Sequence, residues 1–133
     1  MPIQSDYLDR IFNKERFKDR LDDAKKKLKG VKFDAIAVSG NSGTIFGGAL
    51  AQKLKKELIL VRKENDCGHS HYNIEGDYSS KKYIFVDDFI SSGRTKKFVM
   101  TSLSKDEVFA HLDYVGTYEY CNNLWNPAPS YKR

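Results

Sequence analysis

Apolar residues follow two different periods along this chain. From about Asp6 to Lys29 they recur at helical spacing, which predicts one long amphipathic helix that ends before Gly30; the apolar positions are Leu8, Ile11, Phe12, Phe17, Leu21, Ala24 and Leu28. Short apolar runs bounded by turn residues predict strands instead. These runs cover residues 33–38, 58–61 and 83–86, and a further strand is expected near 108–115.

Two more helices are predicted between the strands, over 44–56 and 95–103. The first of them is rich in glycine and alanine, which favours close packing against a sheet. Strands that alternate with helices indicate an α/β fold with a parallel sheet and helical crossovers. A length of 133 residues fits one domain, so we treat 1–133 as a single unit.

The net charge of +5 comes largely from lysines at 25–29 and at 53, 55 and 56. We interpret these clusters as solvated helix faces; attraction of a polyanion such as RNA is the alternative. No apolar run approaches the ~20 residues of a membrane span, so no membrane partner is expected. Two cysteines at unrelated positions, Cys67 and Cys121, make no disulfide framework, which favours the cytoplasm.

Several segments leave their roles open. Cys67, His69 and His71 lie close together, but their spacing is too cramped for common structural zinc sites. Residues 64–80 are polar and contain two glycines, which predicts a mobile loop. Residues 119–133 are aromatic and rich in turns, and are expected either to cap the fold or to join a subunit contact.

The most informative stretch runs from Tyr83 to Thr95. An apolar strand leads to Asp87 and Asp88 at its carboxyl end, where open α/β sheets bind their ligands. Adjacent carboxylates can accept hydrogen bonds from two vicinal ribose hydroxyls, directly or through a cation. A small-residue loop then opens a helix and predicts a phosphate site made by Ser91, Ser92, Gly93, Arg94 and Thr95. The alternative is an ordinary strand-turn-helix with a chance acidic pair.

This stretch resembles the PRPP-binding motif (PRPP, phosphoribosyl pyrophosphate) of the type I phosphoribosyltransferases. The resemblance implies a parallel-sheet α/β fold of that type, with flanking helices and a small or reduced hood. It also implies that Asp87 and Asp88 hold the ribose of PRPP and, indirectly, Mg²⁺, while residues 91–95 hold the 5′-phosphate. A second strand, turn and helix follow the same family pattern, which places pyrophosphate at Ser39, Gly40, Asn41, Ser42 and Gly43.

The order of further motifs resembles the adenine branch of the family. Phe46 to Ala51, Val61-Arg62-Lys63 and the run 72–76 each have a similar counterpart there, and the resemblance implies catalytic roles for Arg62, Lys63 and Glu75. The adenine-type pyrophosphate loop, however, carries an acidic residue and an arginine where this chain has Gly40 and Ser42. Arg94 also replaces a frequent glycine of the phosphate loop.

We therefore expect a PRPP-dependent, Mg²⁺-requiring transferase of purine salvage, which moves ribose 5-phosphate to a nitrogenous base and releases pyrophosphate. The partners expected are PRPP, a nucleobase or nucleotide, and a second copy in a homodimer. A regulator of the same fold that binds PRPP or nucleotide without turnover, with RNA as a further partner, remains an alternative. An unrelated doubly wound mononucleotide binder is a third. The sequence does not identify the base.

Overall fold

A six-stranded sheet organises the computed structural model, which describes residues 4–5, 8–63 and 72–131. The strands are β1 (Ala35–Val38), β2 (Glu57–Val61), β3 (Ile74–Glu75), β4 (Lys82–Asp87), β5 (Asp113–Glu119) and β6 (Leu124–Pro127). Their spatial order is β3-β2-β1-β4-β5-β6. The four central strands are parallel, while β3 and β6 pair antiparallel at the two edges. The expected α/β architecture is confirmed.

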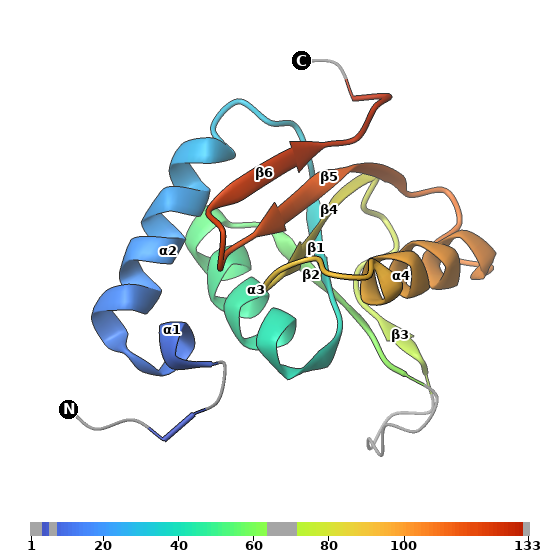
Figure 1. The fold of residues 1–133 in the computed structure, drawn as a ribbon. Coiled ribbons are helices and arrows are strands. Elements are labelled where there is room, and N and C mark those ends of the chain that lie inside the picture. Colours follow the sequence, from blue (N-terminus) through green and yellow to red (C-terminus); the bar gives the residue numbers. More distant parts are fainter. Residues whose placement is uncertain (1–3, 6–7, 64–71, 132–133) are drawn as a thin grey trace.

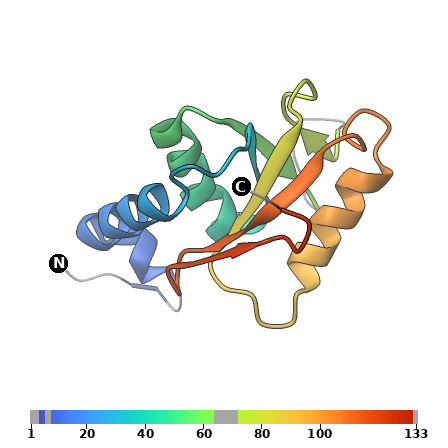
Figure 2. The same cartoon turned by 90° about the horizontal axis from the view of Figure 1, so that it is seen from above.

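Helices cover both faces of the sheet, as Figures 1 and 2 show. Helices α1 (Asp9–Phe12), α2 (Lys14–Lys27) and α3 (Gly40–Leu54) lie on one face, and α4 (Arg94–Lys105) lies on the other. Because side chains alternate along a strand, β1 feeds both layers. Ile36 and Val38 join the core under α2 and α3, whereas Ala35 and Ala37 join the core under α4.

The N-terminal helix is divided in two, contrary to the prediction of one helix from 6 to 29. The break lies at Asn13, whose extended backbone lets its side chain accept hydrogen bonds from the amides of Glu15 and Arg16. Asn13 thereby caps the start of α2. Gly30 follows the end of α2 with a positive φ of 83°, as expected of a residue just past a helix.

Helix α3 begins at Gly40, four residues earlier than the sequence pattern predicted. The segment interpreted as a polar loop, 39–43, is therefore the N-cap and first turn of a helix. Strand β5 is displaced in the other direction, to 113–119 rather than 108–115. The side chain of Asp106 accepts hydrogen bonds from the amides of Val108 and Phe109, which holds that segment in a turn.

Two strands had no counterpart in the prediction. Strand β3 is only two residues long and pairs with the end of β2, while β6 follows a tight turn and pairs with β5 along four residues. Between β2 and β4 the described residues add only β3. Within the described ranges, no helix is both long and apolar enough to cross a membrane.

Candidate active site

A cavity of about 320 Å³ lies where β1 and β4 end and α3 begins. It collects residues from segments far apart in the sequence, as expected where neighbouring parallel strands share one edge. Its lining comprises Ser39, Gly40, Asn41, Ser42, Lys63, Asp87, Asp88, Phe89, Ser91 and Thr95. The acidic pair, most of the expected pyrophosphate segment and part of the expected phosphate loop therefore face one space.

Asp87 is the buried member of the acidic pair, with only 7% of its surface exposed. Its Oδ1 atom accepts hydrogen bonds from the Asp88 amide (2.9 Å) and from the Ser42 hydroxyl (3.4 Å). Burial raises the pKa of Asp87 to about 7, because a charged carboxylate loses its hydration there. The hydrogen bond from the Asp88 amide opposes the rise, and the charge of Asp88 adds to it. This carboxyl group therefore titrates near neutral pH.

Asp88 is only partly buried, so the two adjacent carboxylates have different surroundings. Its Oδ1 accepts the amide of Phe89 at 2.8 Å, which turns the chain out of β4. Asp87 thus forms part of the floor of the cavity, and Asp88 stands at its wall. A ligand with two neighbouring hydroxyls, or a hydrated cation, could contact both.

The N-terminus of α3 opens onto the acidic pair. Its N-cap residue, Ser39, makes no side-chain capping bond, and the buried Ser39 Oγ has no hydrogen-bond partner among the described residues. At Gly43 the backbone passes so close to β4 that a Cβ atom would lie 3.0 Å from the Val86 carbonyl oxygen and 3.3 Å from Asp87 Oδ1. A side chain here would require the neighbouring atoms to shift, so glycine favours this close approach of the first turn to the acidic pair.

The segment between β4 and α4 forms a loop that projects beyond the sheet in Figure 2. Residues 91, 92 and 94 are exposed, and Gly93 has a φ of 78°, which favours glycine at the N-cap of α4. A second, smaller cavity of about 40 Å³ lies inside this loop. Residues 87 and 89–96 line this smaller cavity, so the entire expected phosphate loop, 91–95, surrounds it.

Neither α3 nor α4 has the N-terminal features of an ordinary stable helix. Both lack a capping hydrogen bond from the side chain of the N-cap residue and an acidic residue in the first turn, whereas α2 has Asn13 and Glu15 in these roles. The first turn of α4 instead carries Arg94, Lys96 and Lys97, although the Ser92 hydroxyl accepts the Arg94 amide at 3.3 Å. Cations at a helix N-terminus are unfavourable. An anion bound at the N-terminus of α4 would relieve this unfavourable interaction.

The three residues expected to be catalytic are not brought together. Lys63 lines the cavity with the acidic pair, but Arg62 lines a different hollow, beside Phe98 and Lys105 of α4. Arg62 forms an ion pair with Glu75 of β3 at 3.1 Å and donates to the Tyr72 carbonyl oxygen at 3.2 Å. This arrangement holds β3 on the end of β2. It leaves the catalytic roles of Arg62 and Glu75 as predictions.

Sequence reasoning missed the residues at the end of β5. Glu119 is buried and accepts the Ile90 amide at 2.8 Å, and the Tyr120 hydroxyl donates to the Ser42 carbonyl oxygen at 3.2 Å. Two signals pointed here: a charged residue closes an apolar run, and an aromatic residue follows it. A strand that ends at Val115, as the sequence pattern predicts, would leave both residues beyond the sheet.

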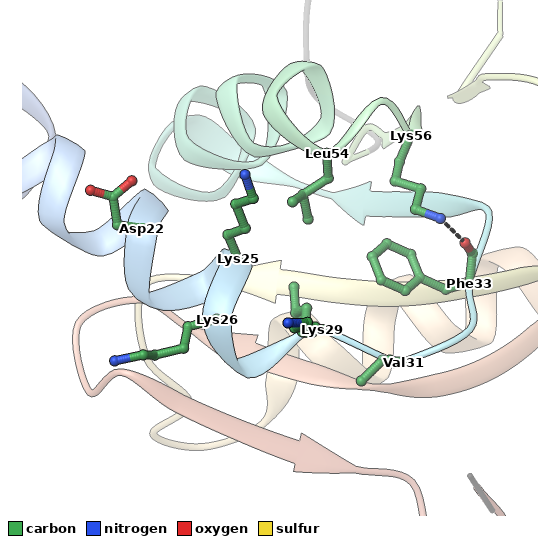
Figure 3. Close-up of a pocket in the computed structure, with 10 residues that line it drawn as sticks. Asp22, Lys25, Lys26, Lys29, Val31, Phe33, Leu54 and Lys56 are labelled. Atoms are coloured by element: carbon green, nitrogen blue, oxygen red, sulfur yellow. Dashed lines mark hydrogen bonds between the residues drawn. The ribbon is translucent and has the colours of Figure 1, made fainter.

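A separate basic hollow of about 620 Å³ lies near the amino ends of β1 and β2 (Figure 3). Lys25, Lys26, Lys29 and Lys56 stand around its apolar lining. Lys56 donates to the Phe33 carbonyl oxygen at 2.7 Å and lies over the Phe33 ring. Helices α2 and α3 both end here, and lysines near helix C-termini complement the helix dipole. The interpretation of these lysines as structural and solvated surface is favoured.

The segment with Cys67, His69 and His71 lies outside the described residues, as does half of the loop expected over 64–80. The remaining part, 72–80, is held against the rest of the protein by β3 and by Ser80, whose carbonyl oxygen contacts His111. Within this segment, Ser79 donates hydrogen bonds to Asp77. Among the residues that the structure describes, no group of three or more metal-binding side chains occurs.

Solved structures share this fold at low sequence identity. An adenine phosphoribosyltransferase from Saccharomyces cerevisiae matches with a TM-score of 0.63 and 21% identity, covering 92% of this chain and 82% of that chain. A UMP synthase from Leishmania donovani matches with a TM-score of 0.68 and 24% identity, covering 88% of this chain and 24% of that chain. The expected type I phosphoribosyltransferase fold is confirmed.

Curated relatives point to the same family. An adenine phosphoribosyltransferase from Thermosipho africanus is 34% identical over 100 residues, which cover 64% of this chain and 59% of that protein. An orotate phosphoribosyltransferase from Archaeoglobus fulgidus is 36% identical over 72 residues, covering half of this chain and 38% of that protein. This chain thus spans less than two thirds of these relatives.

One family model matches most of the chain. The PRTase-CE model covers residues 3–117, which include the acidic pair, the phosphate loop, the first turn of α3 and most of β5. The match and the adenine phosphoribosyltransferase relatives confirm the resemblance inferred from the motifs. This chain belongs to the PRTase-CE family.

Proposed function

We propose that this protein binds PRPP and transfers its ribose 5-phosphate to a nitrogenous base, with a purine-like base favoured. The observation that carries the proposal is a pair of adjoining cavities that share Asp87, with a helix N-terminus on either side of the carboxylate pair. PRPP has the matching pattern, since its 5′-phosphate and its pyrophosphate flank a ribose with two vicinal hydroxyls.

In this arrangement Asp87 and Asp88 would accept the ribose hydroxyls. The 5′-phosphate would lie within the loop 91–95, where exposed hydroxyls and amides surround the smaller cavity. Pyrophosphate would lie at the first turn of α3, from Ser39 to Gly43, with Lys63 at the same cavity wall. Ser39, whose buried hydroxyl has no partner among the described residues, lines the same cavity.

The donor atoms fit Mg²⁺, which prefers oxygen ligands and keeps several waters. Two carboxylates and the hydroxyls of Ser39 and Ser42 are hard oxygen donors, and the raised pKa of Asp87 fits a site that favours added positive charge. Asp87 and Asp88 would hold the ion indirectly, through water or PRPP. When bound with PRPP, Mg²⁺ would supply charge neutralisation for the pyrophosphate.

The reaction would depend mainly on positioning and on charge stabilisation. The bond from the anomeric carbon to the pyrophosphate oxygen breaks, a bond to a ring nitrogen of the base forms, and the base loses that nitrogen's proton. The α3 N-terminus and Lys63 would stabilise the negative charge on departing pyrophosphate. The phosphate loop would hold the sugar while the base approaches.

The preference for a purine rests on the relatives. Adenine phosphoribosyltransferases from several organisms match this chain at 26–34% identity. The Saccharomyces cerevisiae structure with a related fold contains adenine and an imino-altritol bisphosphate. A homodimer, purine salvage and a cytoplasmic location belong to the same proposal.

One observation favours a second function, binding of PRPP or a nucleotide without turnover. Arg62 is paired with Glu75 beside α4 rather than facing the cavity, and the first turn of α3 carries no charged side chain. Without Arg62 in the cavity, the site has fewer cations to stabilise the negative charge on departing pyrophosphate. A regulator with this site could use the exposed lysine surfaces to bind RNA.

The experiment that separates the two functions is a nucleobase panel with Mg²⁺ and PRPP, with released pyrophosphate as the readout. The panel includes adenine, hypoxanthine, guanine, uracil, orotate and nicotinamide. The transferase proposal expects release that depends on both the base and Mg²⁺, with a purine fastest. PRPP binding without release for any base would instead support the regulator, and RNA binding would strengthen that conclusion.

A further inference from the structure

The carboxyl end of β5 and the two residues after it contact three segments around the acidic-pair site. The Tyr120 amide donates to the Asp87 carbonyl oxygen at 3.1 Å, and the Cys121 amide donates to the Asp88 carbonyl oxygen at 2.9 Å. The Tyr120 hydroxyl reaches the Ser42 carbonyl oxygen on α3. Three consecutive residues, 119–121, thus connect the end of β4, the first turn of α3 and the residue just before the phosphate loop.

Glu119 makes the contact to the phosphate loop. Its side chain is buried, with 5% of the residue's surface exposed, and Oε1 accepts the Ile90 amide at 2.8 Å. Asn122 donates to the same oxygen at 3.2 Å, and Asn126 donates to Oε2 at 3.2 Å. Asn122 lies in the turn after β5 and Asn126 lies in β6. The hairpin of β5 and β6 at the edge of the sheet therefore holds the carboxylate in place.

The position of Ile90 explains what this contact can do. It lies two residues after Asp88 and one before Ser91, so it joins the acidic pair to the phosphate loop. An amide fixed at this point sets where the loop leaves the sheet. A residue that only filled the core here would favour an apolar side chain, because burying a carboxylate costs free energy. Instead, both carboxylate oxygens of Glu119 accept hydrogen bonds from N–H donors.

We infer that Glu119 is a positioning residue that holds the phosphate loop at its distance from the acidic pair, with Asn122 and Asn126 orienting its carboxylate. The inference rests on the proposed function, in which the loop 91–95 binds the 5′-phosphate of PRPP. Glu119 does not touch the ligand; it acts through the Ile90 amide. Loss of Glu119 should therefore weaken PRPP binding and make the loop more mobile, while the acidic pair and Lys63 keep their positions.

The test compares Glu119→Met, which keeps the length of the side chain and removes its acceptors, with Glu119→Gln, whose amide oxygen can still accept the Ile90 amide. Mg²⁺-PRPP affinity is measured by calorimetry, and amide exchange at Ile90 and residues 91–95 by NMR. We expect ~10–100-fold weaker binding and faster exchange at Ile90 for the methionine variant. The glutamine variant should stay within ~3-fold of the wild type on both readouts.

The control is Glu107→Gln, at an exposed glutamate beyond α4, which should change neither readout. Affinity within ~2-fold of wild type in Glu119→Met would overturn the inference, as would an equal loss in the glutamine and methionine variants. If Glu119→Met does not fold, Asn126→Ala carries the test, because it frees one carboxylate oxygen. It should weaken binding ~3–10-fold, and unchanged affinity would overturn the inference.

The two proposals fail in distinguishable ways. If the wild type does not bind Mg²⁺-PRPP, the proposed function fails, but amide exchange in the free protein still tests whether Glu119 holds the loop. If the wild type binds PRPP and Glu119→Met binds it equally well with unchanged exchange, only the positioning role fails.

Discussion

At the scale of single residues, the two carboxylates of the site are chemically different. Asp87 is enclosed by β4 and α3 and has a pKa near 7, while Asp88 reaches the wall of the cavity. The sequence predicted both residues and their place after a strand. The sequence could not show that only Asp87 is buried, because the first turn of α3 covers it. That turn is more than 40 positions away in the chain.

The raised pKa of Asp87 has a definite sign for stability. A carboxyl usually titrates near 4, so between pH 4 and pH 7 the folded protein binds a proton that the unfolded chain has lost. The stability that protonated Asp87 contributes to the folded state is therefore fully present below pH 4 and is lost as pH rises through 7. At pH 8, the ionised Asp87 opposes folding.

We predict that Asp87→Asn raises the free energy of unfolding by roughly 1–3 kcal/mol at pH 8 and by much less at pH 5. The variant should bind Mg²⁺-PRPP poorly although it is more stable. Denaturant titrations at the two pH values measure the effect. Asp113→Asn, at an exposed carboxylate on the amino end of β5, is the control and should show no such dependence. An Asp87→Asn variant that is less stable at pH 8 than the wild type would contradict the assignment.

PRPP affinity should depend on pH for the same reason. If ionised Asp87 is the form that accepts ribose hydroxyls or a hydrated cation, affinity should fall below pH 7, by at most about tenfold per pH unit. Calorimetric titrations from pH 5.5 to 8.5 measure this. PRPP phosphates also titrate in this range, so the same series in Asp87→Asn isolates the contribution of Asp87. Parallel profiles in the two proteins would rule out its role.

At the scale of elements, the site consists of two strand ends and two helix starts. The sequence predicted strands 83–86 and 58–61 well because their apolar runs are continuous. It misplaced the start of α3, because Gly40 to Gly43 have the composition of a loop and become helical only where the turn packs on β4. It missed β6 because a four-residue edge strand depends on its partner rather than on its own pattern.

The close approach of α3 to β4 can be tested with two glycines of the same helix. Gly43→Ala would place Cβ 3.0 Å from the Val86 carbonyl oxygen, so we expect a loss of roughly 1–3 kcal/mol in stability and weaker PRPP binding. Gly48→Ala is the matched control. Its Cβ would meet only Leu58 Cδ2, at 3.9 Å, so helix propensity should stabilise the protein by about 0.5–1 kcal/mol. Thermal unfolding of both variants measures the difference, and an equal effect in both would refute the close packing.

The link from β5 to α3 can be tested with two tyrosines that lie on the same strand-end segment. Tyr120→Phe removes the hydrogen bond to the Ser42 carbonyl oxygen, and Tyr118→Phe removes one to Asp23 Oδ2 at 2.6 Å. Each should cost about 1 kcal/mol of stability. Only Tyr120→Phe should also weaken PRPP binding, because Tyr118 contacts α2 and not the site. Equal PRPP affinity in both variants would show that this link does not support the site.

At the scale of the whole molecule, the parallel core of four strands places every candidate binding group at one edge. The sequence indicated this architecture from the alternation of strands and helices, and the fold is that of the type I phosphoribosyltransferases. The motifs singled out the acidic pair and both segments that are expected to bind anions, and these line adjoining cavities. They did not show that Arg62 turns toward Glu75 and α4, because that depends on the antiparallel strand β3.

The central claim is that the site between α3, β4 and α4 binds PRPP. Calorimetric titration of Mg²⁺-PRPP into the wild type and into Asp88→Asn tests it most directly, because Asp88 faces the cavity while its substitution leaves the core intact. We predict saturable, Mg²⁺-dependent binding with a stoichiometry of about one per chain. The variant should bind at least ~10-fold more weakly, with an unchanged melting temperature. No saturable binding to the wild type, or equal affinity in Asp88→Asn, would contradict the account.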